Sequence, residues 1–525
     1  MESNSPGNAQ LPFFRTFVRT QKWTIQSRTR CCPPFSKIDR NSIGHALEDH
    51  LFIVFDTTNS SGVVRGEDNA LHVGKLSSWL YGDDNMSEKD LQTFRLSEIE
   101  PGLQERVWSY LRRVRTFCGS IYEVELRVWP IIANLLGTEI ILPNVRHLAL
   151  MECEQQSYTT LKPVAHVLSP TIDGITFING AASLGLINFI SSNKLPHLIA
   201  LWFKRYEVSG LDLVQTTRPA FSKFRHLRYL AICSRAPTCP NYFSELSFEL
   251  SKCESLEQLD ITIEPPRAGE MTPVFSNFDI LTINPPNLRD LAIRIHYPTI
   301  RLVRIVPNVT KLTIAIIPGA IDLQFLLRQP YIYHLETLAI DFVRKVEGKT
   351  FDIPAFSLTD FALWKDRAES LKVFRLFGAP FALSAKELIG LIDSWPSLYA
   401  LFISDYNGNS NNTSIRPISS EVLTHISSRI PKLTSLALPL DFTFLKEPLD
   451  VAFHSSDIRT VNGLTELRLD RWEGIPEGPE KMVVLNNLKV LFPNLRRISA
   501  FKEAEHELPE LNLCLRQLLV SNKDR

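Results

Sequence analysis

The nine residues Leu142-Pro143-Asn144-Val145-Arg146-His147-Leu148-Ala149-Leu150 decide the fold, because close copies of this phrase return along the chain. Two clear copies lie at residues 195–203 and 224–232, and each ends in Leu-x-x-Leu-x-Ile or a near variant. With a weaker copy at residues 172–177, thirteen copies follow one another at a mean spacing of about 29 residues. The sequence therefore predicts one irregular but continuous array of repeats.

Each copy of the phrase combines a turn with a short strand. Its last two apolar residues are two positions apart, so they point to one face of the strand while their neighbours point to the other. A proline in or before many copies favours an extended backbone at this point, and these prolines are Pro143, Pro196, Pro286, Pro307, Pro396, Pro431 and Pro493. We expect one face of each strand to lie in a core and the other to face solvent.

Amphipathic helices are predicted between the strands. In residues 384–395, Leu388, Leu391 and Ile392 recur at helical spacing, and Ser384 with Glu387 forms a capping box. Similar patterns occur at residues 180–192, 241–252, 357–368, 419–429 and 478–491. A strand and a helix of this size cannot bury their apolar faces alone, so neighbouring repeats must stack and share a core.

The predicted fold is an α/β leucine-rich-repeat-like solenoid, a horseshoe with parallel strands on the concave side and helices on the convex side. The alternative is a set of separate doubly wound α/β domains, whose strands would be rich in Val and Ile without a shared preceding phrase. The Asn or Cys that follows the strand in regular leucine-rich repeats is mostly missing. We therefore expect less uniform repeats than in regular members of this class.

Composition argues against several function classes. Lys plus Arg and Asp plus Glu number 57 each, so no net charge draws the chain to nucleic acid or anionic lipid. No apolar run approaches the roughly 18 residues that cross a bilayer, and the N-terminus lacks a secretory signal. The eight cysteines form no Cys-x-x-Cys pair. We expect reduced thiols and a cytoplasmic or nuclear protein without cofactor or metal.

Four parts are predicted along the chain. Residues 1–90 form a largely irregular or disordered leader, and an organelle transit peptide is the alternative because the first 40 residues are basic and nearly free of acids. Residues 91–141 form a helical N-terminal cap, residues 142–500 form the array, and residues 501–525 form a helical C-terminal cap.

A family resemblance is carried by residues 91–95 (Leu-Gln-Thr-Phe-Arg), residues 105–115 (Glu-Arg-Val-Trp-Ser-Tyr-Leu-Arg-Arg-Val-Arg) and residues 142–148. Over residues 91–500 the chain resembles the F-box-like leucine-rich-repeat proteins of mushroom-forming fungi. The resemblance implies repeats that select a substrate, and an N-terminal F-box that engages the adaptor subunit of a cullin-type ubiquitin ligase. The chain departs from the family here: Leu11-Pro12 is followed by Phe13-Phe14-Arg15-Thr16, and no F-box is recognisable before residue 91.

Binding residues are expected at strand positions that face the concave side, because these positions are rigid but free of core packing. We predict the partner-binding set Trp202, Tyr229, Asp260, Arg294, Arg375, Phe402 and Arg468. Exposed aromatic and arginine side chains dominate interface energetics. The alternatives are that Trp202 and Phe402 belong to the core, and that Arg375 and Arg468 are ordinary solvated charges.

No phosphate loop, dinucleotide fingerprint, nucleophile elbow or metalloprotease helix occurs in the sequence. The twelve histidines are scattered, and we assign His147 and His226 to the same repeat position and to a structural role. The predicted function is a non-enzymatic, monomeric protein-interaction module that forms the substrate-recognition part of an F-box-type adaptor. The alternative is an orphan scaffold that binds its partner without ubiquitin-ligase coupling.

Overall fold

The computed structural model describes residues 105, 108–109, 111–120, 129–130, 132–134, 136–151, 162–178, 190, 195–206, 224, 226–235, 242–265, 280–296, 302–306, 309–317, 323–343, 345–346, 349–350, 368–378, 384–404, 420–438, 463–469, 479–500, 512–513 and 515. They belong to one compact unit of residues 52–525. The predicted leader, residues 1–90, lies outside the described residues, and so does most of the predicted C-terminal cap.

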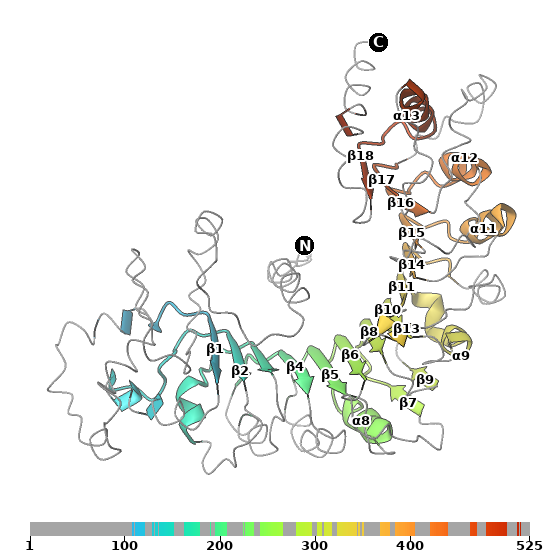
Figure 1. Ribbon diagram of the computed structural model, residues 1–525. Helices are drawn as coiled ribbons and strands as arrows, with labels where there is room; N and C mark the ends of the chain where they lie inside the picture. The colour runs from blue at the N-terminus through green and yellow to red at the C-terminus, as the bar shows by residue number, and fades with distance from the viewer. Residues whose placement is uncertain are drawn as a thin grey trace, which may run out of the picture. The chain divides into compact units, whose positions relative to one another are not determined.

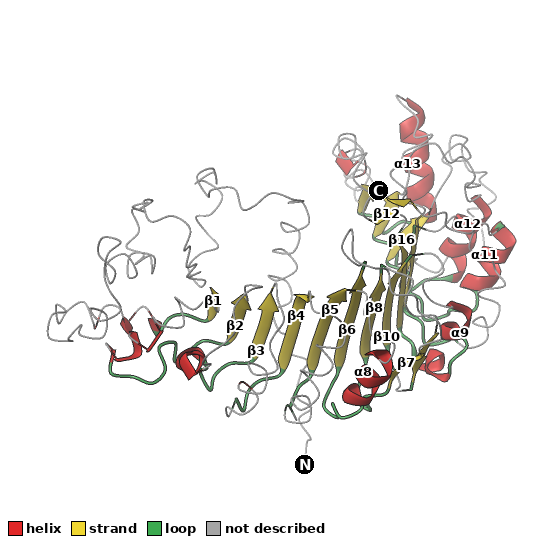
Figure 2. Cartoon of the chain, turned by 60° about the horizontal axis from the view of Figure 1, so that its bottom comes forward, coloured by secondary structure: helices red, strands yellow, loops and turns green. Residues whose placement is uncertain are grey.

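Parallel strands form at all thirteen copies of the repeated phrase, and with one earlier strand they make a 14-stranded sheet (Figure 2). Neighbouring strands follow chain order, which excludes doubly wound domains because their strand order reverses. The strands are β1 (Thr116–Ser120), β2 (His147–Met151), β3 (Gly174–Ile178), β4 (Ala200–Tyr206), β5 (Tyr229–Arg235), β6 (Gln258–Glu264), β8 (Asp290–Ile295), β10 (Lys311–Ile316), β11 (Thr337–Phe342), β14 (Val373–Phe377), β15 (Ala400–Ser404), β16 (Ser435–Leu438), β17 (Glu466–Leu469) and β18 (Arg497–Ala500).

The core lies along one face of this sheet. In β6 the burial alternates strictly, and Leu259, Ile261 and Ile263 are buried while the residues between them are partly exposed. The parallel pairing aligns Leu259 with Leu230 of β5 and Leu291 of β8, so equivalent apolar side chains stack from repeat to repeat. Each fully buried Leu or Ile contributes about 1.5–3 kcal/mol.

Four helices form at predicted ranges: α8 (Tyr242–Leu250), α11 (Ala385–Ile392), α12 (Ser420–Arg429) and α13 (Pro479–Leu491). They lie along the same face of the sheet (Figure 1), with the shorter α9 (Leu323–Leu327). The predicted capping box of α11 is present. The helices predicted at 180–192 and 357–368 lie almost entirely outside the described residues. Within the part of the chain that is described, no helix combines the length and apolar character needed to cross a bilayer.

The prediction that residues 91–141 form a helical cap is correct only in part. Residues 108–109 and 132–134 are helical, but residues 116–120 form β1, which pairs in parallel with β2. Val114 and Phe117 take the first two core positions of the phrase and are buried, but Gly119 stands where the third apolar residue is expected. The missing apolar side chain hid this copy from the sequence pattern.

Two small sheets were also not predicted. Strands β7 (Ile280–Ile283) and β9 (Leu302–Ile305) pair in parallel, and β12 (Lys345–Val346) pairs antiparallel with β13 (Lys349–Thr350). Each of these two strands, β7 and β9, buries two side chains. Strand β7 also packs against α8. These short strands therefore add four apolar side chains to the core, namely Leu281, Ile283, Val303 and Ile305.

The turns before the strands explain part of the repeated phrase. The side-chain amide of Asn144 donates to the carbonyl of Arg112, and that of Asn287 donates to the carbonyl of Glu254, both at 2.8 Å. Each acceptor lies in the preceding repeat. Asparagines before the strand thus link neighbouring repeats, although the asparagine ladder after the strand is mostly missing.

Candidate partner-binding face

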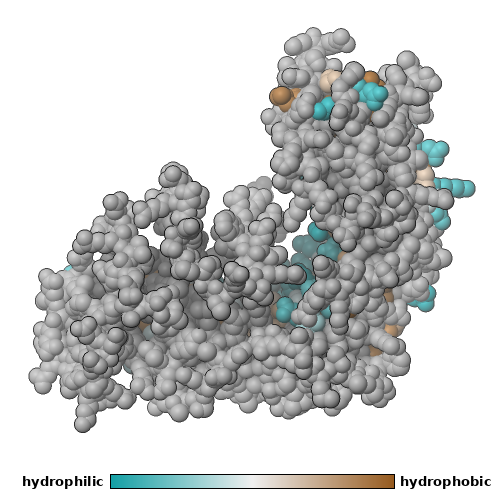
Figure 3. Space-filling view, viewed as in Figure 1, coloured by the Kyte–Doolittle hydropathy of each residue, from teal (hydrophilic) through white to brown (hydrophobic). Residues whose placement is uncertain are grey.

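All seven predicted binding residues lie on the sheet face opposite the core, which we call the open face. Trp202, Asp260, Arg375, Phe402 and Arg468 share one register row across the sheet. Tyr229 and Arg294 stand two residues before and after this row, so their side chains share the face. The middle of this face is hydrophilic in the space-filling view (Figure 3).

An aromatic patch forms where His147, Trp202 and Tyr229 meet. The ring of Trp202 lies 5.1 Å from the ring of His147, edge to face, and 5.1 Å from the ring of Tyr229. His147 is buried, and its Nε2 makes a 3.0 Å hydrogen bond with the hydroxyl of Thr176. Trp202 and Tyr229 are only partly buried. Aromatic pairs at this distance add about 0.5–1.5 kcal/mol beyond burial, so the patch is a fixed surface.

Charged residues border the aromatic patch. Burial, and to a lesser extent the nearby carboxylate of Asp260, raise the pKa of Tyr229 to about 12, so its phenol is neutral at physiological pH. Asp260 itself forms an ion pair with Arg294. Both oxygens of the Asp260 carboxylate face the same guanidinium nitrogen. The pair orients both side chains beside the aromatic rings.

A second patch lies on β11, β14 and β15. The guanidinium of Arg375 lies 4.0 Å from the ring centre of Phe377, and its Nε is 3.4 Å from Oδ1 of Asp341. Arg375 is exposed, and its register partner on β15 is Phe402, which is partly exposed. A guanidinium held by stacking and by a carboxylate is pre-organised for a partner.

Arg468 stands apart from both patches. It lies on β17, in register with Ala437 of β16 and Ser499 of β18, and is partly buried. Between the two patches the same register row holds the small residues Ala292, Thr313 and Ala339. The open face therefore presents two patches of large side chains. The strands between them carry small residues in this row and the Asp290–Lys311 ion pair two residues earlier on the same face.

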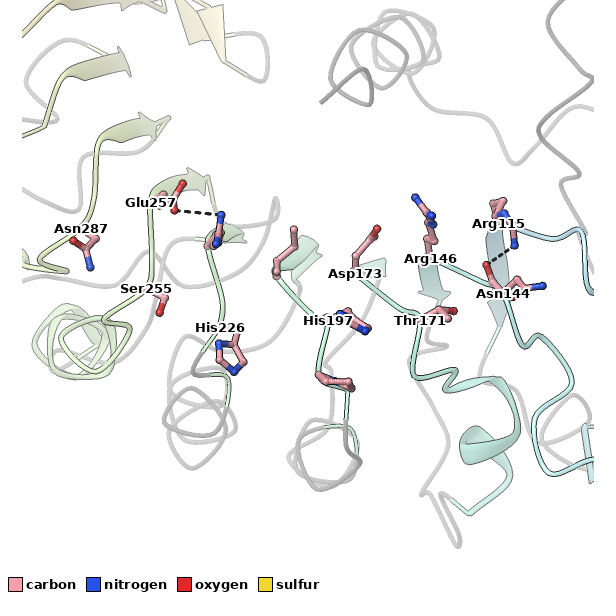
Figure 4. A pocket seen from close by; sticks show the side chains of 13 residues that line it. Arg115, Asn144, Arg146, Thr171, Asp173, His197, His226, Ser255, Glu257 and Asn287 are labelled. Atoms are coloured by element: carbon pink, nitrogen blue, oxygen red, sulfur yellow. Dashed lines mark hydrogen bonds and ion pairs between the residues drawn. The ribbon is translucent and has the colours of Figure 1, made fainter. Parts of the chain in front are cut away.

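A groove along the N-terminal ends of the strands was missed by sequence reasoning. This edge groove has a volume of about 810 Å³ (Figure 4), and its lining residues are Arg115, Asn144, Arg146, Thr171, Asp173, Pro196, His197, Ile199, His226, Arg228, Ser255, Glu257 and Asn287. They occupy the positions directly before β1 to β6 and the turns that lead into β2 to β8. The predicted set considered only residues within the strands, so it did not include them.

The edge groove mixes positive and negative side chains. Arg228 and Glu257 form an exposed ion pair at 3.7 Å, and Nη1 of Arg115 donates to the carbonyl of Asn144 at 3.1 Å (Figure 4). Burial raises the pKa of Asp173, although the neighbouring charge of Arg146 acts in the opposite direction. The groove is therefore a polar surface with one partly desolvated carboxylate among its lining residues.

The histidine assignment is corrected by the strand register. His147 aligns with Gly174, Ala200 and Tyr229, so it belongs to the open face. His226 stands three residues before Tyr229, at an exposed position of the edge groove. The two histidines were placed together because each precedes a leucine of the phrase, but the phrase contains several such leucines.

Comparisons with known proteins assign no family. No protein-family model matches the chain, and no curated protein matches it. Among solved structures, one similar chain comes from a crystal structure of the Rad7 and Elc1 complex in yeast, with 12% sequence identity and a TM-score of 0.32. The match covers 73% of this chain and 85% of that chain. Across the described residues, no group of three or more His, Cys, Asp or Glu is arranged to hold a metal ion.

Proposed function

We propose that this chain is a non-enzymatic, leucine-rich-repeat-like solenoid that binds another protein through its open face. The contact between Trp202 and Tyr229 carries this proposal. Both rings remain partly accessible while their neighbours fix their positions, and rigid aromatic side chains contribute most strongly to protein interfaces. A partner that covers this patch buries aromatic surface without first having to order it.

The ion pairs beside the rings supply specificity in this proposal. Arg294 and Arg375 each retain exposed surface after pairing with Asp260 and Asp341. Charged groups of this kind select partners of complementary charge and fix the binding register, while they contribute less to affinity than the aromatic rings. We expect the partner surface to place apolar side chains over the aromatic patch and polar groups toward the arginines.

The test compares the full-length wild-type chain with Trp202→Ala in proximity labelling within the native cell, followed by affinity measurement on the purified partner. We expect Trp202→Ala to weaken binding by about 2 kcal/mol, or roughly 30-fold. Phe248→Ala is the matched control, because Phe248 is an exposed aromatic residue on α8 and so belongs to the helix side. Equal labelling by wild type and Trp202→Ala would reject the open face as the binding site.

A more specific role is the substrate-recognition part of a cullin-type ubiquitin ligase. It is supported by the resemblance of residues 91–500 to F-box-like repeat proteins. The residues after Leu11-Pro12 do not follow the F-box pattern, and this favours the second candidate, an orphan scaffold without ligase coupling. Capture of the purified ligase adaptor subunit by the full-length chain supports the first role, and failure of capture supports the second.

A further inference from the structure

The edge groove concentrates positive charge at its β1 end. Arg115 and Arg146 line it from the positions directly before β1 and β2, and both side chains are exposed. Arg112 and Arg113, which are also exposed, precede Arg115 in the chain. Within the groove lining, Asp173 is the carboxylate nearest to these arginines in register. The opposite end differs, because there Arg228 is matched by Glu257.

Asp173 is a single carboxylate beside two arginines, so it offsets this charge only in part. Its carboxylate is half-buried, and burial disfavours its charged form, so that its pKa is raised despite the neighbouring Arg146. The β1 half of the groove thus holds one carboxylate and two exposed guanidinium groups, and of the two arginines only Arg146 acts on Asp173. The site therefore has spare capacity for hydrogen bonds to an external anion.

We infer that the edge groove binds an acidic, extended segment of a partner protein, whose carboxylates pair with Arg115 and Arg146. Guanidinium groups bind carboxylates through two parallel hydrogen bonds, which makes arginine the side chain suited to this recognition. The edge groove and the open face use different residues, so this inference goes beyond the proposed function.

The dimensions of the groove set the length of the segment. Neighbouring strands lie about 4.8 Å apart, so the four steps from β1 to β5 span about 19 Å. An extended chain rises about 3.3 Å per residue, and about seven residues therefore reach from Arg115 to Arg228. A segment of this length can place acidic side chains at the β1 end and still contact His197 and His226 further along.

The mixed lining favours a peptide over a nucleic acid. Asp173 and Glu257 stand among the arginines, and a continuous phosphate backbone would pass both carboxylates. Proteins that hold nucleic acid usually present an unbroken basic surface, and this chain has no net charge. An acidic peptide avoids the repulsion because it can present uncharged residues at these two positions.

The probe, called the glutamate peptide, is a fluorescein-labelled heptapeptide of alternating glutamate and glutamine, so that uncharged residues can lie opposite Asp173 and Glu257. Its all-glutamine counterpart, the glutamine peptide, is the neutral control. Fluorescence anisotropy with the full-length chain should show binding of the glutamate peptide that weakens as salt is raised. The double variant Arg115→Gln with Arg146→Gln should bind at least about tenfold more weakly, because two charge-assisted contacts are lost. The matched control is Arg496→Gln, which changes an exposed arginine directly before β18, outside the groove.

The inference would be overturned by equal binding of the glutamine peptide, by an equal loss in Arg496→Gln, or by no loss in the double variant. Tighter binding of a heptamer of deoxythymidine than of the glutamate peptide would also overturn it, in favour of a nucleic-acid site. Trp202→Ala should leave peptide binding unchanged. The edge groove and the open face can therefore fail independently of each other.

Discussion

The indole of Trp202 fills the space that a side chain at position 174 would need. A Cβ atom on Gly174 would lie 2.7 Å from Cζ3 of Trp202 and 2.9 Å from Nδ1 of His147. Both rings are held by further contacts, since His147 bonds to Thr176 and Trp202 packs against Tyr229. Gly174 thus determines how the aromatic patch is arranged, although it has no side chain to offer a partner.

Gly174→Ala is expected to lower the free energy of unfolding by about 1–3 kcal/mol, because an added methyl group forces well-packed neighbours to move. Urea denaturation of wild type and variant measures the change. In a Trp202→Ala background the added methyl group meets open space on one side, so the same substitution should cost less there. An equal cost in both backgrounds would show that Trp202 and Gly174 are not coupled.

Asn287→Ala is expected to destabilise the chain by about 0.5–1.5 kcal/mol, because the hydrogen bond to the Glu254 carbonyl is lost. Asn287→Asp has nearly the same shape but cannot donate from its carboxylate, and it should lose at least as much. Thermal unfolding of both variants measures the effect. Wild-type stability in Asn287→Asp would show that the amide does not stabilise the contact between repeats.

The alternation of apolar residues was sufficient to predict the main sheet. Each phrase buries three apolar residues, and their spacing determines where the strand lies and which of its faces is buried. Residues such as Leu256, Leu259 and Ile261 therefore identify a repeat from the sequence alone. Strand β1 was not recognised as a copy of the phrase because Gly119 carries no apolar side chain. Strands β7 and β9 were not predicted because neither follows the turn of the repeated phrase. They pair with each other, although they are separate segments of the chain.

The candidate site was predictable only in part, because alternation assigns a face but not a contact. Alternation placed Trp202 and Tyr229 on one side of the sheet. It did not indicate that the indole of Trp202 would lie over Gly174 and against the ring of His147. The edge groove depends still more on the tertiary structure. Arg115 and Arg146 are 31 residues apart in the chain and come together only because β1 and β2 pair in parallel.

Ser384→Ala is expected to destabilise the chain by about 1 kcal/mol through loss of the cap on α11. The Ser384 hydroxyl accepts from the backbone N–H of Glu387 at 3.3 Å, and the Glu387 carboxylate accepts from the backbone N–H of Ser384 at 2.8 Å. Ser384→Thr keeps an acceptor oxygen and should retain most of the stability. Equal loss in both variants, measured by urea denaturation, would contradict a capping role.

Asp341 provides a prediction with a defined pH dependence. Burial raises its pKa above the ordinary 3.8, and this effect outweighs the opposing charge of Arg375. Between pH 3.8 and the raised value, the folded chain therefore holds a proton that the unfolded chain has released. The contribution of this residue to the free energy of unfolding must fall as pH rises through that interval, and it is constant below and above it.

Asp341→Asn removes this pH dependence, because asparagine resembles the protonated acid at every pH. The stability of the variant relative to wild type should therefore increase from pH 3.8 upward and level off above the folded pKa of Asp341. Urea denaturation of both proteins at matched pH values measures the difference, in which all other titrating groups cancel. Arg375→Gln should widen the interval, because it removes the positive charge that lowers the pKa of Asp341. Parallel stability curves for wild type and Asp341→Asn would show that the pKa of Asp341 is the same in the folded and unfolded chains, and so that burial does not outweigh the charge of Arg375.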